Sequence, residues 1–295
     1  MVLRSMAESL QPKKGVLYVV GTPIGNLEDI TYRAVRILRE AGLIACEDTR
    51  HTRKLLDHYG IEGKVISYHE HNEAERAQEL VERLLEGVDV AQVSDAGMPG
   101  ISDPGYRVIK LAIEQGIPVV PVPGPSALIA ALAASGLSTD AFEFRGFLPA
   151  KSGQRRTELE LIRTQECTVV FYEAPHRIRE TLSDIVAILG PERPLVVARE
   201  LTKVHEEFLR GTAREVAESI RDREMKGEIT VLIGKAIALE QPEIIDASAR
   251  LQEIMREQKV DEKAALKVLA KERGVSKSEV YREVQRRLKP RREHS

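Results

Sequence analysis

Residues 90–125 read VAQVSDAGMPGISDPGYRVIKLAIEQGIPVVPVPGP, and this stretch decides the fold. The apolar run at 88–93 stops at Ser94, and a loop rich in glycine and proline follows. Residues 106–114 have helical spacing, and residues 118–122 form a second apolar run that ends in Pro-Gly-Pro-Ser. The order strand, loop, helix, strand, loop is typical of a parallel α/β sheet, in which ligands bind beyond the carboxyl ends of the strands. We therefore expect an α/β fold with its site in these two loops.

Three further apolar runs lie upstream, at 16–20, 43–45 and 64–67, and each is followed by a polar loop and a helical stretch. The first of these loops, at 21–26, contains neither G-x-G-x-x-G nor G-K-[ST]. The sequence therefore carries no dinucleotide-binding or P-loop signature. The two glycines of the loop either let the backbone approach a cofactor or serve a tight strand-to-helix turn.

The loop after residue 45 concentrates charged side chains at the end of a predicted strand. In one interpretation Arg50 binds a phosphate, and Glu47, Asp48 or His51 handles protons. In the other, Asp48 or Thr49 caps the next helix and Arg50 pairs with a carboxylate. The residues alone leave both interpretations open.

The sequence indicates no metal site and no disulfide framework. Two histidines flank Glu70, but no obvious third ligand and no H-E-x-x-H accompany them. Cys46 and Cys167 are the two cysteines, and no apolar run approaches the roughly 20 residues needed to span a bilayer. Residues 1–15 lack the apolar core of a signal peptide, and residues 1–13 are expected to be a disordered leader. We therefore expect a cytoplasmic protein that does not bind membranes.

The second half of the chain repeats the alternation of strands and helices. Strands are expected at 142–144, 168–172, 195–198, 206–210 and 229–233, with linkers near Gly136 and at 241–245. Basic residues recur at the strand ends, where they either line a cleft for a polyanion or are ordinary surface and ion-paired residues. The candidates for binding RNA or another polyanion are Arg50, Lys151, Arg155, Arg156, Arg177 and Lys203.

Residues 245–290 are expected to form a separate helical domain. Helical periodicity at 247–258, 263–272 and 276–288, with a turn at Gly274 and a cap at Ser276, is typical of a helix-turn-helix. The segment 245–295 carries a net charge of +5, whereas the rest of the chain carries −7. This basic segment either contacts nucleic acid or serves for packing or dimerisation.

Six motifs, in order along the chain, resemble the tetrapyrrole-methylase superfamily, and in particular its members that methylate ribosomal RNA. They are LYVVGTPIGNL at 17–27, SDAGMPGISDPG at 94–105, PVPGPSAL at 121–128, FRGFLP at 144–149, VFYEAPHR at 170–177 and GEITVLIG at 227–234. The resemblance implies two α/β domains, at 14–136 and 137–240, with S-adenosylmethionine in the cleft between them, and usually a homodimer. It further implies 2′-O-methylation of a cytidine, cytidine 1402, in the 16S rRNA of the small ribosomal subunit.

The resemblance also implies a donor site. Members that act on tetrapyrroles carry Gly-Asp-Pro where this chain has Ser94-Asp95-Ala96, so the aspartate is retained but the next turn residue differs. Carried over position by position, the cofactor-binding residues are Pro23, Ser94, Asp95, Ala96, Gly97, Ser126, Ala127, Tyr172, Glu173, Leu201, Glu228, Ile229 and Thr230.

No motif assigns the group that takes the proton from the ribose hydroxyl. A general base has to lie within hydrogen-bond reach of that proton. The catalytic candidates are Glu47, Asp48, His51 and Glu200, and the proton can also pass to water. Aromatic residues make up 4% of the chain, which favours phosphate contacts over a stacking platform in RNA binding.

Two other functions are considered. One is a tetrapyrrole C-methyltransferase of the same fold, for which the basic C-terminal segment has no evident use. The other is a DNA-binding regulator whose α/β part senses a small molecule, which would bind duplex DNA and transfer no methyl group. The length and the motif density of the α/β part argue against the regulator.

Overall fold

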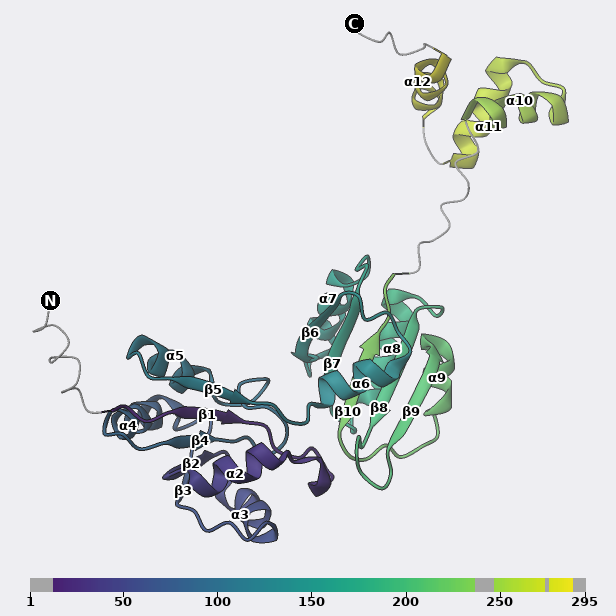
Figure 1. Ribbon diagram of the computed structural model, residues 1–295. Coiled ribbons are helices and arrows are strands. Elements are labelled where there is room, and N and C mark those ends of the chain that lie inside the picture. Colours follow the sequence, from purple (N-terminus) through teal and green to yellow (C-terminus); the bar gives the residue numbers. More distant parts are fainter. Residues whose placement is uncertain (1–12, 237–246, 274–275, 289–295) are drawn as a thin grey trace, which may run out of the picture. The chain divides into compact units, whose positions relative to one another are not determined.

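The structure, a computed structural model, describes residues 13–236, 247–273 and 276–288. The described residues up to Ala236 form one compact unit that contains two β-sheets (Figure 1). The helices from Ala247 onward belong to a second unit. The expected α/β class with an added helical segment is confirmed. The predicted leader, apart from Lys13, and the predicted linker at 241–245 lie outside the described residues.

The first sheet is wholly parallel. Its strands are β1 (Leu17–Val20), β2 (Leu43–Cys46), β3 (Val65–Ser67), β4 (Val90–Gln92) and β5 (Val119–Val122). They are arranged in the order β3-β2-β4-β1-β5. The strands are short and mostly apolar because helices cover both faces of the sheet, so that residues pointing to either side are shielded from water.

Four helices cover the first sheet. They are α2 (Tyr32–Glu40), α3 (Thr49–His58), α4 (Glu73–Leu85) and α5 (Tyr106–Glu114), and a turn of 3-10 helix, η1 (Leu27–Asp29), precedes α2. Successive strand residues point to opposite faces. One face, with Ile44 and Ala91, packs against α2 and α3, and the other, with Leu43 and Val90, packs against α4 and α5.

The loops after β1 and β4 diverge at the carboxyl edge of this sheet. These two strands are neighbours, but the chain leaves β1 toward the face covered by α2 and leaves β4 toward the face covered by α5. Such a divergence leaves a crevice where ligands bind in open α/β sheets. At its base Thr22 and Gly97 pair through two backbone hydrogen bonds, of 2.9 and 3.1 Å. The topology thus places a potential site beside the SDAGMPGISDPG loop.

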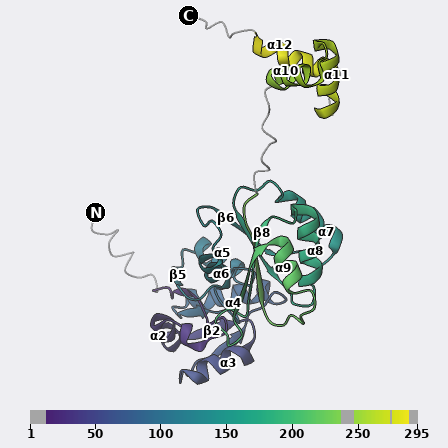
Figure 2. The same cartoon turned by 90° about the vertical axis from the view of Figure 1, so that its right-hand side faces the viewer.

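The second sheet is mixed. Its strands are β6 (Phe142–Phe147), β7 (Thr168–Glu173), β8 (Pro194–Arg199), β9 (Glu207–Thr212) and β10 (Ile229–Ile233), in the order β6-β7-β10-β8-β9. The β6–β7 pair is parallel and the other pairs are antiparallel. One face is covered by α7 (Ser152–Leu161), α8 (Ile178–Leu189) and α9 (Ala213–Ser219), which lie together in Figure 2.

A small apolar helix, α6 (Ala127–Ser135), covers the other face of the second sheet. It follows β5 of the first sheet, yet Leu128 and Leu132 pack against Val170 and Leu232. Its sequence, ALIAALAAS, is apolar on every side, so periodicity does not show which sheet the helix covers. The division between the α/β domains was expected near Gly136, and the packing of α6 groups this helix with the residues that follow Gly136. We call residues 13–122 the first lobe and residues 127–236 the second lobe.

The C-terminal unit consists of α10 (Ala247–Gln258), α11 (Glu262–Arg273) and α12 (Lys277–Leu288). Leu251, Ile254, Leu269 and Val280 form its core. The N–H of Ser276 donates to the Glu279 carboxylate, and the Ser276 hydroxyl accepts from the N–H of Glu279, so Ser276 caps α12 as expected. The turn predicted at Gly274 lies outside the described residues. None of the helices within the described ranges is long and apolar enough to cross a membrane.

Candidate functional site

A cavity of about 340 Å³ is lined by residues of both lobes. This volume lies within the roughly 300–1,000 Å³ that is typical of small-molecule sites. All of the predicted cofactor-binding residues except Pro23, Ser94 and Asp95 line it. The lining residues are Ile24, Ala96, Gly97, Met98, Ile101, Asp103, Ser126, Ala127, Phe147, Tyr172, Glu173, Ala174, Pro175, Leu201, Gly227, Glu228, Ile229 and Thr230.

The wall from the first lobe is a tight turn held by Ser94. The buried Ser94 hydroxyl lies 3.3 Å from the carbonyl oxygens of Ala96 and Gly97, to which it can donate. Gly97 has φ +83, a conformation that residues with a Cβ rarely adopt. Asp95 points away from the turn and accepts a hydrogen bond of 3.0 Å from the N–H of Asp48. Ser94 and Asp95 therefore shape the turn, whereas Ala96 and Gly97 line the cavity.

The N-terminus of α6 forms the side of the cavity between the lobes. Ser126 and Ala127 line the cavity, and no side chain caps the first turn of α6. Amide groups at a helix N-terminus favour a negatively charged ligand group. The loop before α6 packs closely on the loop after β1, since a Cβ built on Gly124 would lie 2.7 Å from the Cα of Gly21. Only glycine fits at both positions without moving the two loops apart.

The wall from the second lobe is built by strand register. Ile229 of β10 lies between Glu173 of β7 and Arg199 of β8, so the ends of three strands meet at one edge. Tyr172 stacks edge-to-face against Phe147, the last residue of β6. Burial raises the pKa of the Tyr172 hydroxyl, and a hydrogen bond with the backbone of Leu128 opposes this shift. The result is an aromatic wall that faces the turn at 94–97.

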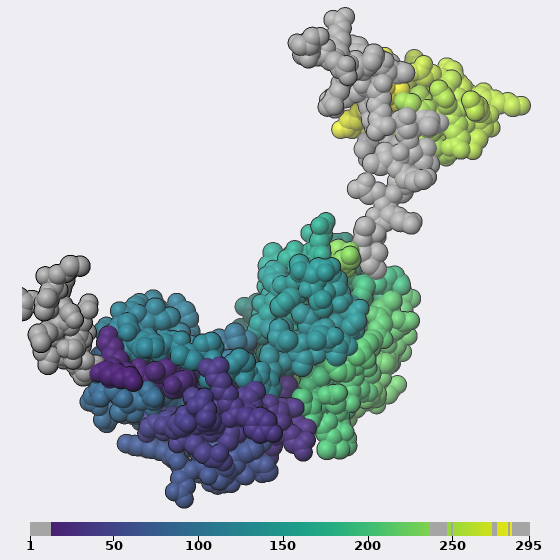
Figure 3. All heavy atoms as spheres, viewed as in Figure 1, coloured from purple at the N-terminus to yellow at the C-terminus, as the bar shows by residue number. Residues whose placement is uncertain are grey.

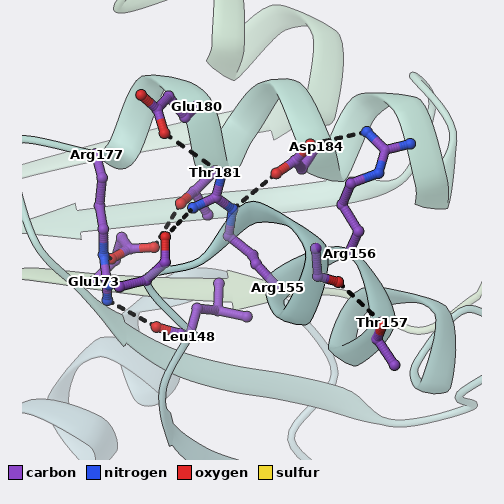
Figure 4. A network of polar contacts seen from close by, with 11 residues as sticks. Leu148, Arg155, Arg156, Thr157, Glu173, Arg177, Glu180, Thr181 and Asp184 are labelled. Atoms are coloured by element: carbon purple, nitrogen blue, oxygen red, sulfur yellow. Dashed lines mark hydrogen bonds and ion pairs between the residues drawn. The ribbon is translucent and has the colours of Figure 1, made fainter.

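Glu173 lines the cavity, but its carboxylate is bound by neighbouring groups of the protein (Figure 4). The carboxylate accepts hydrogen bonds from the N–H of Ala174 at 2.7 Å, from the Thr181 hydroxyl at 2.6 Å and from the Arg177 guanidinium. Arg177 also donates to the carbonyl of Leu148 at 2.8 Å. Glu173 and Arg177 therefore fix the loop at the cavity wall, and neither charge is free for a ligand.

Two of the residues proposed for RNA binding are built into the second lobe instead. Arg155 is 1% exposed, donates to Asp184 at 2.8 Å and lies 3.6 Å from Glu180 (Figure 4). Arg177 is held by Glu173, as described above. A buried guanidinium that is paired with carboxylates does not reach an RNA phosphate, so RNA contact by Arg155 does not fit its position. Burial of an unpaired arginine would be costly, which explains the carboxylates around it.

The remaining RNA candidates differ in exposure. The side chains of Arg50 and Arg156 are 87% and 52% exposed, although they pair with Asp48 and Asp184. Lys151, before α7, is exposed. These three are placed to meet a polyanion, and their role stays a prediction.

Lys203 and Glu200 hold a strained loop between the lobes. Lys203 Nζ lies 2.8 Å from Glu200 and 3.1 Å from Glu228, and the pKa of Glu200 is lowered chiefly by Lys203. Glu200 and Thr202 have φ values of +51 and +66, which cost about 1–3 kcal/mol each in such residues. The Thr202 hydroxyl accepts a hydrogen bond of 3.1 Å from the N–H of Asn26. Figure 3 shows that purple surface of the first lobe meets green surface of the second lobe. The Glu200 carboxylate thus supports the loop that presents Leu201.

The other catalytic candidates lie at the end of β2 and do not line the cavity. Asp48 accepts the N–H of Arg50 at 2.8 Å and pairs with its side chain, so the interpretation as a helix cap fits the geometry. The Arg50 guanidinium holds the pKa of Asp48 well below its usual range. Burial, and next the charge of Asp95, raises the pKa of Glu47, while His51 is exposed.

Asp103 is a cavity residue that the sequence analysis did not single out. It lies in the loop between β4 and α5, within the second part of the SDAGMPGISDPG motif. Burial, followed by the negative charge of Glu47, raises the pKa of the Asp103 carboxyl to about 6. The sequence feature that could have identified Asp103 is the Asp-Pro-Gly that ends the loop after a buried parallel strand. In the described part of the chain, no group of three or more His, Cys, Asp or Glu residues is arranged to hold a metal ion.

Comparison with known proteins gives both family and fold. Residues 16–217 match the family model described as Tetrapyrrole (Corrin/Porphyrin) Methylases. The chain is 47% identical over 272 residues to the Ribosomal RNA small subunit methyltransferase I of Halalkalibacterium halodurans, covering 91% of this chain and 94% of that protein. It is 44% identical to the protein of the same name from Escherichia coli O157:H7, with 93% and 96% covered.

Solved structures with low identity show the same fold. A diphthine synthase matches with a TM-score of 0.60 at 16% identity, covering 75% of this chain and 90% of that chain. The uroporphyrin-III C-methyl transferase of Thermus thermophilus, in complex with S-adenosyl homocysteine, matches with a TM-score of 0.54 at 21% identity, covering 75% and 98%.

Proposed function

The chain belongs to the tetrapyrrole methylase family, among the relatives named ribosomal RNA small subunit methyltransferase I, and on this premise we propose that it methylates ribosomal RNA with S-adenosylmethionine. The observation that supports this most is the identity of 47% over 91% of the chain. The aligned span is so long that it must include part of the C-terminal unit. More specifically, we propose 2′-O-methylation of a cytidine, cytidine 1402, in 16S rRNA. We further propose that the protein acts in the cytoplasm as a homodimer.

The cavity fits S-adenosylmethionine in its size and in the chemistry of its walls. The uncapped amide groups at Ser126 and Ala127 suit the carboxylate of the amino acid part. Ala96 and Gly97 present backbone and small side chains, which allow close approach of a bulky ligand. When bound, the donor supplies a methyl group that is already electrophilic.

The residues of the chain have two tasks in this reaction. They place the ribose oxygen in line with the sulfur–methyl bond at roughly 3 Å, where orientation alone removes much of the barrier. They also receive the proton of a weakly acidic hydroxyl. Phosphates of the RNA would meet the exposed cations Arg50, Lys151 and Arg156, because neutralised phosphates dominate the affinity for nucleic acids.

The test is methyl transfer from labelled S-adenosylmethionine to small ribosomal subunits that lack the modification. We expect label in 16S rRNA and a single 2′-O-methylcytidine in the digested product, identified by mass spectrometry. Label in another nucleoside would contradict the proposed position but keep RNA as the substrate. No label in RNA, together with transfer to a tetrapyrrole, would overturn the proposed substrate.

A further inference from the structure

The loop at 98–105 places Asp103 at the cavity. Hydrogen bonds to the two residues that follow Asp103 hold this loop in place. Gln92 of β4, which is fully buried, donates from Nε2 to the carbonyl of Pro104 at 3.1 Å. The N–H of Gly105 donates to Glu73 at 3.2 Å, and the hydroxyl of the buried Tyr68 orients that carboxylate from 3.0 Å. These anchors come from a strand and a helix of the first lobe. Asp103 is therefore positioned by the scaffold and not by a freely moving loop.

The end of β6 reaches this loop from the other lobe. A Cβ built on Gly146 would lie 3.6 Å from the hydroxyl of Ser102, so the residue before Phe147 lies against the residue before Asp103. Phe147 is 58% exposed and Ile101 is 46% exposed, although both line the cavity. Exposed apolar side chains at a cavity rim suit the flat face of a base that leaves its stack. The rim beside Asp103 is thus the side on which a nucleoside would enter.

Asp103 differs from the other carboxylates of the cavity wall in its partners. Glu173 is held by Arg177, and Glu228 lies 3.1 Å from Lys203. The groups that act on Asp103 are Glu47 from the end of β2, Asp95 from the end of β4 and the hydroxyl of Ser94, and Asp103 in turn acts on Tyr172 of the second lobe. No cation is among them. Burial and these negative charges raise the pKa of Asp103 to about 6, so it is a stronger base than an ordinary aspartate and is still largely ionised at neutral pH.

We propose that Asp103 is the catalytic residue that accepts the proton of the substrate hydroxyl, an inference that rests on the proposed RNA methylation. In the transfer, a bond forms between the hydroxyl oxygen and the methyl carbon. The bond between that carbon and the sulfonium sulfur breaks, and the electron pair stays on sulfur. The proton passes to a carboxylate oxygen of Asp103, from which it exchanges with water. Glu47 lies outside the lining and tunes Asp103 through its charge.

The test compares the wild type with Asp103→Asn, whose amide has the same shape but accepts no proton at neutral pH. We expect kcat to fall by roughly 100-fold or more, in line with the usual contribution of a general base. We expect the Kd for S-adenosylhomocysteine, measured by calorimetry, to change less than about threefold, because fold and cavity are retained. In the wild type kcat should rise with pH through about 6, and this step should be absent in the variant.

Two further variants separate the competing explanations. Glu47→Gln removes a charge that raises the pKa of Asp103, so the pH step should move to lower pH. Asp57→Asn, an exposed aspartate on α3, is the matched control and should behave as the wild type. Asp103→Glu keeps a base and should recover part of the lost rate.

The outcomes that count against Asp103 are distinct from failure of the proposed function. If the wild type transfers no methyl group to RNA, the proposed function fails first. If the wild type is active and Asp103→Asn keeps both its rate and its pH step, Asp103 is not the acceptor. If the variant loses affinity for S-adenosylhomocysteine in proportion to its loss of kcat/KM, Asp103 binds the donor instead. If Glu47→Gln abolishes the rate at pH 8, the proton goes to Glu47.

Discussion

The two lobes both place carboxylates in or near the walls of the cavity but hold them in opposite states. On the second lobe, Glu173 is paired with Arg177, and Lys203 pairs with both Glu200 and Glu228. On the first lobe, burial and next the charge of Asp95 raise the pKa of Glu47, and burial and next the charge of Glu47 raise the pKa of Asp103; the causes of the Asp103 shift include no cation. A carboxylate that is paired with a cation stabilises the structure, whereas a carboxylate without a cation can still accept a proton from a substrate. The comparison separates a wall that supports the cavity from a wall that is equipped for chemistry.

The largest expected effect comes from breaking a pair of the supporting wall. Glu173→Ala leaves the guanidinium of Arg177, itself mostly buried, without its carboxylate, which should cost about 3–5 kcal/mol of unfolding free energy. Urea denaturation measures it. The matched control is Glu228→Ala, whose side chain is 72% exposed and whose ion pair should contribute less than about 1 kcal/mol. Equal losses in the two variants would show that burial does not distinguish these pairs.

A smaller effect is expected where the loops after β1 and β5 touch. In Gly124→Ala the added Cβ would lie 2.7 Å from the Cα of Gly21, so the loops after β1 and β5 must separate. Overpacking of this kind costs about 1–3 kcal/mol, and we expect the affinity for S-adenosylhomocysteine to fall with it. Gly153→Ala in α7 is the control, because nothing lies within 4 Å of the built Cβ and alanine favours helix. A Gly124→Ala variant with unchanged stability and binding would contradict the close packing.

The smallest effect, and the sharpest test of the comparison, is the pH dependence of stability. The pKa of Asp103 is raised in the folded state, so its contribution to stability is present below the usual aspartate range and is lost as pH rises through about 6. Asp103→Asn removes that loss and should be more stable than the wild type at pH 8, with a difference that vanishes as pH falls below the usual aspartate range.

Glu200 should behave in the opposite way. Its pKa is lowered chiefly by Lys203, so its contribution is present above the usual glutamate range and is lost as pH falls through the lowered value. Glu200→Gln should therefore be less stable than the wild type at pH 8, and the difference should shrink in acid. Thermal melts of both variants from about pH 2 to pH 8 measure this. If the stability difference from the wild type changed with pH in the same direction for both variants, the two walls would not differ as described.

Much of the site was predictable because it depends on local sequence. The stop of an apolar run at Ser94, followed by glycine and proline, indicates a strand end, and in a parallel sheet such ends meet at one edge. The loops around Ala96, Ser126 and Tyr172 were expected in the site on this basis and by resemblance, and all three line the cavity. The cap at Asp48 was one of two interpretations of its loop, because the same side chain suits both a cap and a proton carrier.

The features that the sequence did not reveal concern residues whose surroundings come from distant parts of the chain. Arg155 lies in a stretch that reads as a basic loop, yet it is buried and paired with Asp184, which lies 29 residues further along the chain. Asp103 stands in an ordinary Asp-Pro-Gly turn, and its environment arises from burial, from Glu47, which follows β2, and from Asp95 at the start of its own loop. Hydrophobic periodicity does not show either of these contacts, because it describes only the residues within one helix or strand.

The sequence by itself determined the α/β class, the strand ends that carry the site and the glycines that their turns require, because these depend on backbone conformation and local burial. The tertiary structure decided which lobe α6 joins and which charges are neutralised. Desolvation and Coulomb interactions depend on distance in space, and two carboxylates of the same sequence context acquire different pKa values from different neighbours. The division between the supporting wall and the reactive wall is therefore a property of the fold.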